Sequence, residues 1–292
     1  MILIIDFGSQ YNQLIARRVR EFHVYCQIDP PNVDIDYIKH LNPKGIILSG
    51  GPSSIYEKNS PKCDEAIFNL NIPVLGICYG MQFMINALGG TVKKARKREY
   101  GFAELKVKEG AGLFNTVGGK TKTWMSHGDS ITKLPRGFKI TASTENTKIA
   151  ATVHTKKHLY GLQFHPEVHH TAKGKTMLRN FLFDVCGCKR TWTMKSFAKD
   201  SVSQIRDVVG DKKVILGLSG GVDSSVTALL LHHAVGKNLT CIFVDNGLLR
   251  KNEAKKLKKT FKQHLKINIR FVNAKTKFLK ALSEITDPEK KR

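Results

Sequence analysis

Short apolar runs alternate with helix-type repeats through the first ninety residues of the chain. In the first repeat, Leu14, Ile15 and Val19 recur at helical spacing. We expect strands at residues 1–7, 24–28, 45–49 and 74–77, and helices at residues 12–21, 64–70 and 81–88. Buried strands that alternate with helices predict an α/β fold with a mostly parallel sheet covered on both faces. Ligands gather at the carboxyl ends of such strands.

The pattern changes twice further along the chain. Residues 102–163 alternate in short Thr- and Lys-rich segments, which predict added antiparallel strands before a helix at residues 175–185. A second α/β series then begins near residue 190, so we expect domains at residues 1–188 and 189–292. Its expected strands are residues 213–218, 239–244 and 267–272, and its helices are residues 224–234 and 251–264. Because this series has few strands, the chain is expected to stop inside a domain, as a fragment, a split gene or a truncated product.

Composition narrows the class of protein. The 292 residues are 41% hydrophobic and 25% charged, without an 18-residue apolar run or an apolar leader at Met1. The six cysteines are too sparse for a disulfide framework. We therefore expect a cytoplasmic protein with reduced thiols and no membrane partner.

Positive charge is concentrated beyond residue 90. Residues 1–90 hold 7 basic and 8 acidic side chains, residues 91–190 hold 20 and 7, and residues 191–292 hold 21 and 9, for a net charge of +24. Such a surface attracts anions, phosphate esters among them, and nucleic acid is a rival interpretation. The basic runs 93–98 and 255–262 lack interleaved aromatics and fall on an expected loop and an expected helix face. We therefore expect no nucleic-acid partner.

A cysteine between small residues is the first candidate for chemistry. Cys78 lies in Gly-Ile-Cys-Tyr-Gly between an expected strand and an expected helix, where a sharp turn presents the side chain and the helix N-terminus favours a thiolate. A base and its orienting group follow in His165-Pro166-Glu167. Alone, Cys78 would be a buried core thiol, but with these partners it is a candidate nucleophile. After the strand at residues 45–49, the backbone N–H of Gly51, together with that of Tyr79, could bind an oxyanion.

Five motifs together resemble those of class I glutamine amidotransferases over residues 1–188. They are Phe7-Gly8-Ser9-Gln10, Ser49-Gly50-Gly51-Pro52, Gly76 to Gln82, Ser126-His127-Gly128-Asp129 and His165-Pro166-Glu167. The resemblance implies hydrolysis of the glutamine side-chain amide, with Cys78 as nucleophile, His165 as base and Glu167 as its orienter. It also implies that glutamine is bound by Gln82, Ser126, His127, Gly128 and Asp129.

A second candidate site is the run Ser219-Gly220-Gly221-Val222-Asp223-Ser224-Ser225, after an expected strand and at the start of an expected helix. Glycine backbone N–H groups, three hydroxyls and a helix N-terminus suit phosphate. The run resembles the pyrophosphate loop of the ATP pyrophosphatase family. That resemblance implies ATP as co-substrate with Mg²⁺ near Asp223, contact of Val244 with the nucleoside, and no tightly bound organic cofactor.

The two modules together resemble the GMP synthase family. The resemblance implies a class I amidotransferase domain followed by an incomplete Rossmann-like ATP pyrophosphatase domain, with glutamine, ATP and xanthosine monophosphate (XMP) as substrates. The resemblance also implies homodimerisation of full-length members through a C-terminal segment, which we expect to be absent here. A glutaminase or ammonia-donor subunit without synthetase activity, and a basic nucleotide- or nucleic-acid-binding regulator, remain the alternatives.

Overall fold

The computed structural model describes residues 1–291, apart from the side chains of residues 96, 97 and 262–264. It divides into two compact units, Met1–Trp192 and a second that begins at Thr193. Both units are built from helices and sheets with parallel strands, so the α/β class expected from the sequence is confirmed. Residue 292, which the expected second domain includes, lies outside the described residues. Across the described part of the chain, no helix is long and apolar enough to cross a bilayer.

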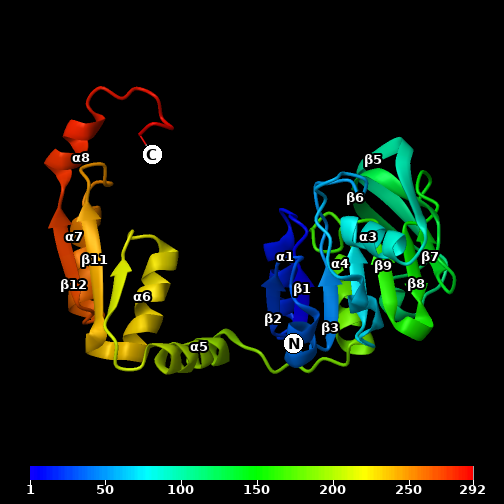
Figure 1. The fold of residues 1–292 in the computed structure, drawn as a ribbon, viewed down its shortest axis with the longest axis horizontal. Coiled ribbons are helices and arrows are strands. Elements are labelled where there is room, and N and C mark those ends of the chain that lie inside the picture. Colours follow the sequence, from blue (N-terminus) through cyan, green and yellow to red (C-terminus); the bar gives the residue numbers. More distant parts are fainter. Residues whose placement is uncertain (292) are drawn as a thin grey trace. The chain divides into compact units, whose positions relative to one another are not determined.

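A nine-stranded sheet runs through the first unit (Figure 1). From β2 to β9 the neighbouring strands are parallel, and from β9 to β6 they are antiparallel. In spatial order the strands are β2 (Cys26–Asp29), β1 (Ile2–Ile5), β3 (Gly45–Leu48), β4 (Val74–Ile77), β9 (Leu159–Leu162), β8 (Ala151–His154), β7 (Lys139–Ser143), β5 (Thr91–Val107) and β6 (Lys120–Lys133).

Strand β1 shows why the parallel half is buried on both faces. Its side chains alternate, so that Ile2 and Ile4 enter one core while Leu3 and Ile5 enter another. The first core includes side chains of α1 and α4, and the second includes those of α2 and α3. The helices of this unit are α1 (Asn12–Glu21), α2 (Ile35–Leu41), η1 (Glu65–Asn69), α3 (Tyr79–Ala87), η2 (Gly112–Phe114), η3 (Thr155–Lys157), α4 (Gly174–Asn180) and η4 (Phe181–Val185).

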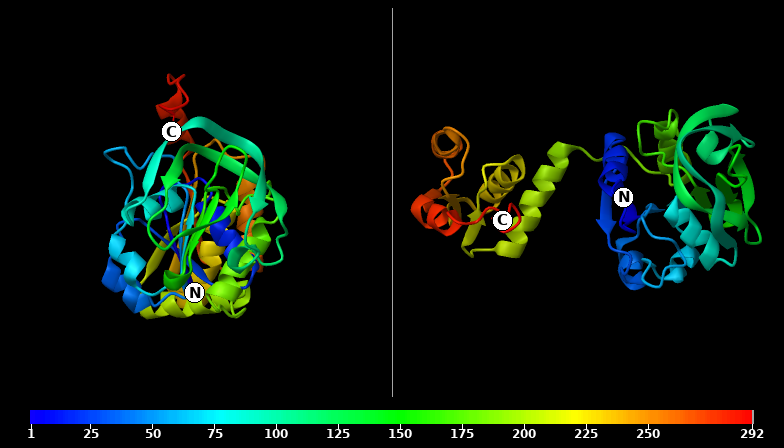
Figure 2. Two further views of the ribbon diagram at one scale, coloured as in Figure 1. Left: turned by 90° about the vertical axis from the view of Figure 1, so that its right-hand side faces the viewer. Right: turned by 90° about the horizontal axis from the view of Figure 1, so that it is seen from above.

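In the antiparallel half of the sheet, one expectation from the sequence is wrong. The basic run 93–98, which we expected on a loop, lies inside β5, and the antiparallel pairing begins at Thr91 rather than near residue 102. Figure 2 shows the long β5–β6 ribbon curving in the first unit. Its register shifts between Lys94 and Glu99. Residue propensities do not predict a lysine-rich strand, because such a strand is stabilised mainly by its pairing with a neighbouring strand.

Two helices that we expected in the first unit are not regular α-helices over their whole length. The helix expected at residues 64–70 is the 3-10 helix η1, and the one expected at residues 175–185 is α4 followed by the π-helical turn η4. Helix α2 was not foreseen, although Asp34 caps it by accepting from the backbone N–H groups of Asp36 and Tyr37.

The second unit has a three-stranded parallel sheet in the order β10 (Val214–Gly217), β11 (Leu239–Asp245) and β12 (Ile269–Asn273). Along β11, Leu239, Cys241 and Phe243 are buried in its core, while Val244 is 41% exposed. Its helices are α5 (Met194–Val209), α6 (Val222–Val235), η5 (Gly236–Asn238), α7 (Glu253–Lys258), η6 (Lys259–His264) and α8 (Lys275–Leu282). Helices α5 and α8 were not foreseen, yet Thr193 and Ser196 form a capping box at the start of α5.

Candidate active site

Cys78 lies at a sharp turn between β4 and α3. Its backbone has φ 51° and ψ −106°, a conformation that few residues other than glycine adopt. The turn packs tightly: a Cβ on Gly76 would lie 2.7 Å from the backbone of Met81, and one on Gly80 would overlap the carbonyl of Leu48. Backbone strain of this kind is typical of active-site residues, and the two glycines explain how the turn forms here.

His165 and Glu167 form a buried pair just beyond β9. The imidazole Nδ1 lies 2.7 Å from Glu167 Oε1, and the glutamate side chain is fully buried. The carbonyl of His165 accepts from Thr171 Oγ1 at 2.6 Å, and Arg18 Nε donates to the carbonyl of Glu167 at 3.0 Å. The backbone on both sides of the proline is therefore held, and the imidazole is oriented by a carboxylate.

The imidazole of His165 reaches Cys78 across Gly50. A Cβ on Gly50 would lie 3.1 Å from His165 Cε1 and 3.8 Å from Cys78 Cβ, so both side chains lie close to this glycine and a larger residue there would crowd the imidazole. Burial alone would lower the pKa of His165, but the charge of Glu167 and hydrogen bonds to Cys78 and Glu167 outweigh it. The pKa therefore stands well above its ordinary value. A raised pKa favours the protonated imidazole that a thiolate needs as its partner.

Cys78 also faces a cavity of about 520 Å³. Both proposed oxyanion donors, Gly51 and Tyr79, line it, and the N–H of Tyr79 belongs to the first turn of α3, which has no partner within its helix. All of the residues expected to bind glutamine also line this cavity: Gln82, Ser126, His127, Gly128 and Asp129. The structure thus brings together the thiol, the oxyanion donors and the expected substrate-binding residues.

These glutamine-binding candidates do not all expose a side chain to the cavity. Gln82 and His127 are each 4% exposed, and their polar atoms contact the protein. Asp129 is more open, and its carboxylate accepts from Ser54 Oγ at 2.5 Å. Gln82 and His127 therefore support the cavity from behind, whereas Asp129 offers a negative charge to it.

Sequence reasoning missed several residues here. Gln163 Nε2 lies 3.7 Å from the sulfur of Cys78, and Lys94, Arg98 and Tyr100 line the cavity from β5. The only signal for Lys94 and Arg98 was their place in the basic run 93–98, and Tyr100 lies just beyond that run. That run was treated as a solvated loop because sequence spacing cannot show which strand passes a distant cysteine.

The second candidate site lies in the second unit, at the turn from β10 into α6. Gly220 has φ +81°, and Gly221 is the residue before the helix. Ser219 Oγ lies 2.9 Å from Ser224 Oγ, while Ser224 and Ser225 donate to the carbonyl of Gly221. Their hydroxyls thus order the turn, and the helix N-terminus is left facing outward.

The remaining nucleotide-site candidates are exposed. Val222 is 78% exposed, Asp223 is exposed in the first turn of α6, and Val244 lies near the end of the neighbouring strand β11. Among the described residues, no three carboxylate, histidine or cysteine side chains cluster as a metal site. One carboxylate together with phosphate oxygens is nonetheless a usual setting for Mg²⁺, so Asp223 fits a metal that arrives with the nucleotide.

The fold and this thiol–imidazole–carboxylate site define an α/β enzyme of the cysteine amidotransferase class. The family model for glutamine amidotransferase class-I matches residues 3–185, and the model for NAD synthase matches residues 194–291. The first match covers more than half of the chain. The chain therefore belongs to the class I glutamine amidotransferase family.

Similar proteins cover the whole of this chain. A protein of Brachyspira hyodysenteriae described as GMP synthase [glutamine-hydrolyzing] is 53% identical over 291 residues, which are 100% of this chain and 57% of that protein. A protein of Rippkaea orientalis with the same description is 51% identical over 292 residues and is covered to 54%. The chain thus spans little more than half the length of these relatives.

Among the solved structures similar to part of this chain, one is at least 30% identical to it. It is a Thermoplasma acidophilum protein described as a candidate GMP synthase subunit, with 30% identity and a TM-score of 0.57. The match covers 64% of this chain and 93% of that one.

Proposed function

We propose that this chain carries the glutamine-hydrolysing part of a glutamine-dependent GMP synthase, a carbon–nitrogen ligase of purine nucleotide biosynthesis. The observation that supports it best is the position of Cys78, with an oriented imidazole at one side and a cavity with oxyanion donors at the other. The descriptions of the two relatives, each at least 51% identical, supply the ligase and its product.

The proposed first reaction is amide hydrolysis through a thioester. The Cys78 thiolate attacks the side-chain amide carbon of glutamine, and the N–H groups of Gly51 and Tyr79 stabilise the oxyanion. Protonated His165 gives its proton to the leaving nitrogen, which departs as ammonia. Neutral His165 then takes a proton from water as the oxygen attacks the thioester, so that glutamate leaves and the thiolate and imidazolium return.

We propose that the second unit binds MgATP, with phosphate at residues 219–225, Mg²⁺ beside Asp223 and the nucleoside near Val244. The match of residues 194–291 to the NAD synthase model supports a nucleotide site. ATP would adenylate an oxygen of XMP and release pyrophosphate, after which ammonia displaces the adenylate. Synthetase activity, homodimerisation and a cytoplasmic location stay predictions for this chain.

A second candidate function is an ammonia-donating subunit that hydrolyses glutamine without making GMP. One observation favours it: the Thermoplasma relative, which is described as a subunit, is covered to 93% by the matching region. This function uses the same thiol and the same cavity.

The experiment that tests the proposal is a glutamine hydrolysis assay on the wild-type chain and on Cys78→Ala. We expect hydrolysis to fall by about 10⁴-fold or more, because no other group replaces a covalent nucleophile. Cys188→Ala, which removes a half-buried thiol far along the sequence, is the matched control and keeps the wild-type rate. Hydrolysis that survives in Cys78→Ala contradicts the proposal. Adding ATP, Mg²⁺ and XMP separates the candidates, since GMP formation excludes the ammonia-donating subunit.

A further inference from the structure

A second buried acid–histidine pair lies behind the cavity, and the proposed reaction does not use it. His127 Nε2 lies 3.6 Å from Glu99 Oε2, and the two side chains are 1% and 9% exposed. A buried carboxylate is costly unless it is paired and hydrogen-bonded. Such a pair therefore needs a structural or functional reason.

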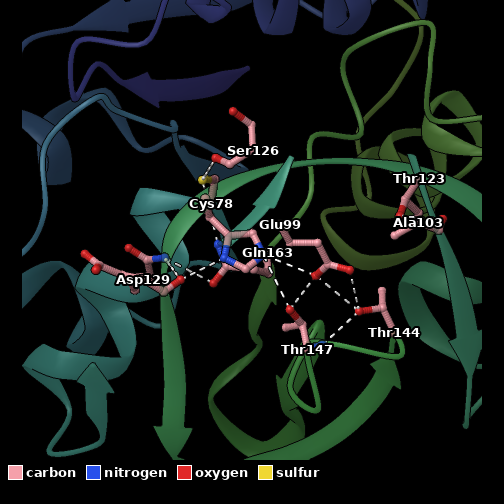
Figure 3. A network of polar contacts seen from close by, with 11 residues as sticks. Cys78, Glu99, Ala103, Thr123, Ser126, Asp129, Thr144, Thr147 and Gln163 are labelled. Carbon is pink, nitrogen blue, oxygen red and sulfur yellow. Dashed lines mark hydrogen bonds and ion pairs between the residues drawn. The ribbon is translucent and has the colours of Figure 1, made fainter. Parts of the chain in front are cut away.

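The pair joins three separate segments of the chain (Figure 3). Glu99 belongs to β5 and His127 to β6, and Glu99 accepts from Thr147 Oγ1 at 2.6 Å and from Thr144 Oγ1 at 3.1 Å in the turn after β7. Thr147 also donates its backbone N–H to Thr144 Oγ1 at 3.0 Å. Burial alone would raise the pKa of Glu99, but the hydrogen bonds from His127, Thr147 and Thr144 outweigh it and lower that pKa.

A chain of polar contacts leads from this pair to the nucleophile. His127 Nδ1 donates to the carbonyl of Asp129 at 2.8 Å, and Gln82 Nε2 donates to the same carbonyl at 3.1 Å. Gln82 Nε2 also lies 3.2 Å from Gln163 Oε1, and Gln163 Nε2 lies 3.7 Å from Cys78 Sγ. Figure 3 shows Gln163 between the sulfur and the Glu99 cluster. The backbone at Asp129 is thereby fixed relative to the thiol.

The same pair also lies beside the residues of β5 that line the cavity. Neighbouring residues of a strand point to opposite faces, so a buried Glu99 directs Arg98 and Tyr100 outward. Both are exposed, and Arg98 Nε and Tyr100 Oη lie 3.9 Å and 3.8 Å from the position a Cβ on Gly128 would take. Arg98 and Tyr100 therefore extend toward Gly128 from the neighbouring strand β5, next to the register shift between Lys94 and Glu99.

The walls of this cavity carry both signs of charge. Lys94 and Arg98 line it from β5, whereas Asp129 and Glu57 line it from other segments. An α-amino acid presents a carboxylate and an ammonium group, and it is bound best when complementary charges are held at a fixed spacing. Glu99 and His127 form the last β5–β6 pair before the register shifts, so their side-chain contact holds the two segments together where the regular ladder is interrupted.

We propose that Glu99 and His127 are positioning residues, which hold the Arg98–Tyr100 segment of β5 and the Ser126–Asp129 segment of β6 in the positions that bind the amino-acid head group of glutamine. The inference rests on the proposed glutaminase function. It assigns the pair to substrate binding and not to thioester chemistry, so substrate affinity should change while the reactivity of Cys78 does not.

The test is steady-state glutamine hydrolysis by Glu99→Gln, which keeps the shape of the side chain and removes its charge. We expect KM for glutamine to rise roughly tenfold while kcat stays within about threefold, because a buried partner is lost away from the reacting atoms. The rate at which iodoacetamide alkylates Cys78, followed by mass spectrometry of its peptide, should match the wild type. Glu104→Gln is the matched control, since Glu104 is also on β5 but forms an exposed ion pair with Lys120 at 3.2 Å, and it should leave KM unchanged.

A double-mutant cycle tests the pairing itself. His127→Asn keeps a donor that can reach the carbonyl of Asp129 but removes the contact with Glu99. We expect the double variant to raise KM about as much as one single variant, because the two residues act as one unit. If Glu99→Gln fails to fold, Thr147→Val, which removes a single hydrogen bond to Glu99, should raise KM roughly threefold.

Two outcomes would overturn the inference. One is an unchanged KM in folded Glu99→Gln and Thr147→Val proteins. The other is a parallel loss of kcat, Cys78 alkylation and thermal stability, which would make the pair a general scaffold element. A wild-type chain that hydrolyses no glutamine would instead contradict the proposed function, so the two failures are distinguishable.

Discussion

Each unit has its candidate site at a turn from a parallel strand into a helix. The turn is buried in the first unit and exposed in the second. Around Cys78 the turn is buried and strained, with glycines at which a Cβ would strike backbone. Around Ser219 to Ser225 the turn is exposed, and a Cβ on Gly221 would meet only Ser219 Oγ at 3.4 Å. The difference follows the expected chemistry. A covalent reaction requires fixed positions for several side chains, whereas a phosphate is recognised largely by backbone N–H groups that an open turn already presents.

Packing around the two turns differs as well. The first unit has core clusters on both faces of its sheet, and the second has a core on one face. Ile215 of β10 is 72% exposed and Val272 of β12 is 39% exposed. Parallel sheets are usually covered on both faces. Apolar packing is therefore more extensive around the thiol site than around residues 219–225.

The largest expected effect is at the buried carboxylate of the thiol site. Glu167→Gln should lower kcat for glutamine hydrolysis on the order of 10³-fold or more, because the imidazole loses the charge that raises its pKa and fixes its orientation. The pH–rate profile of the residual activity should also shift. Asp223→Asn in the second unit is the control, and it should leave glutamine hydrolysis unchanged. A wild-type rate in Glu167→Gln would contradict the assigned role.

The next effect compares one glycine from each turn, Gly80 in the first turn of α3 and Gly221 just before α6. Gly80→Ala should destabilise the first unit by about 3 kcal/mol, since the new methyl overlaps the carbonyl of Leu48 and both backbones must move. Gly221→Ala should change stability by less than about 1 kcal/mol, because its φ of −76° suits alanine and the site is open. Urea denaturation of each variant checks this. Equal losses would refute the contrast between a tight and an open turn.

A smaller effect concerns acid stability of the first unit. The folded-state pKa of Glu99 is lowered, so its contribution to stability is fully present above the unfolded-state pKa and is lost as pH falls through the folded value. We expect the unfolding midpoint in urea to fall between about pH 5 and pH 3, and to fall less in Glu99→Gln. Both tryptophans, Trp124 and Trp192, belong to the first unit, so their fluorescence reports on it. An identical pH dependence in the variant would show that Glu99 does not contribute.

The smallest effect is a difference in local opening that needs no substitution. Backbone amides of β4, whose residues are all buried, should exchange with deuterium more slowly than those of β10, whose residues are exposed or half-buried. Mass spectrometry of peptides from the two strands checks this. Equal protection would mean that the second unit is as stable as the first.

The sequence pattern predicted the bounds of helices and strands well where the local periodicity was clear. The strand at residues 74–77 and the helix at residues 12–21 have the bounds that the structure shows, because both are apolar or amphipathic at a single clear period. The thiol, its base and its orienter were chosen from residue type and from turn chemistry. Their roles stay predictions, but the structure places them together.

Other features depend on contacts between distant segments. Nothing local to Glu99 distinguishes it from other acidic residues in a lysine-rich stretch, and its pairing with His127 exists only because β5 and β6 are neighbours. Gln163 likewise meets Cys78 only through the pairing of β4 with β9.

The amino-acid sequence by itself determined the α/β class, the two strand–turn–helix motifs and the residue types able to carry out acyl transfer, because these follow from periodicity and from the intrinsic chemistry of side chains. Only the tertiary structure decided which residues line the cavity, that the imidazole of His127 is held by Glu99 and the carbonyl of Asp129, and that a basic ribbon forms one of its walls. Those facts depend on strand register, and register is set by contacts between residues far apart in the chain.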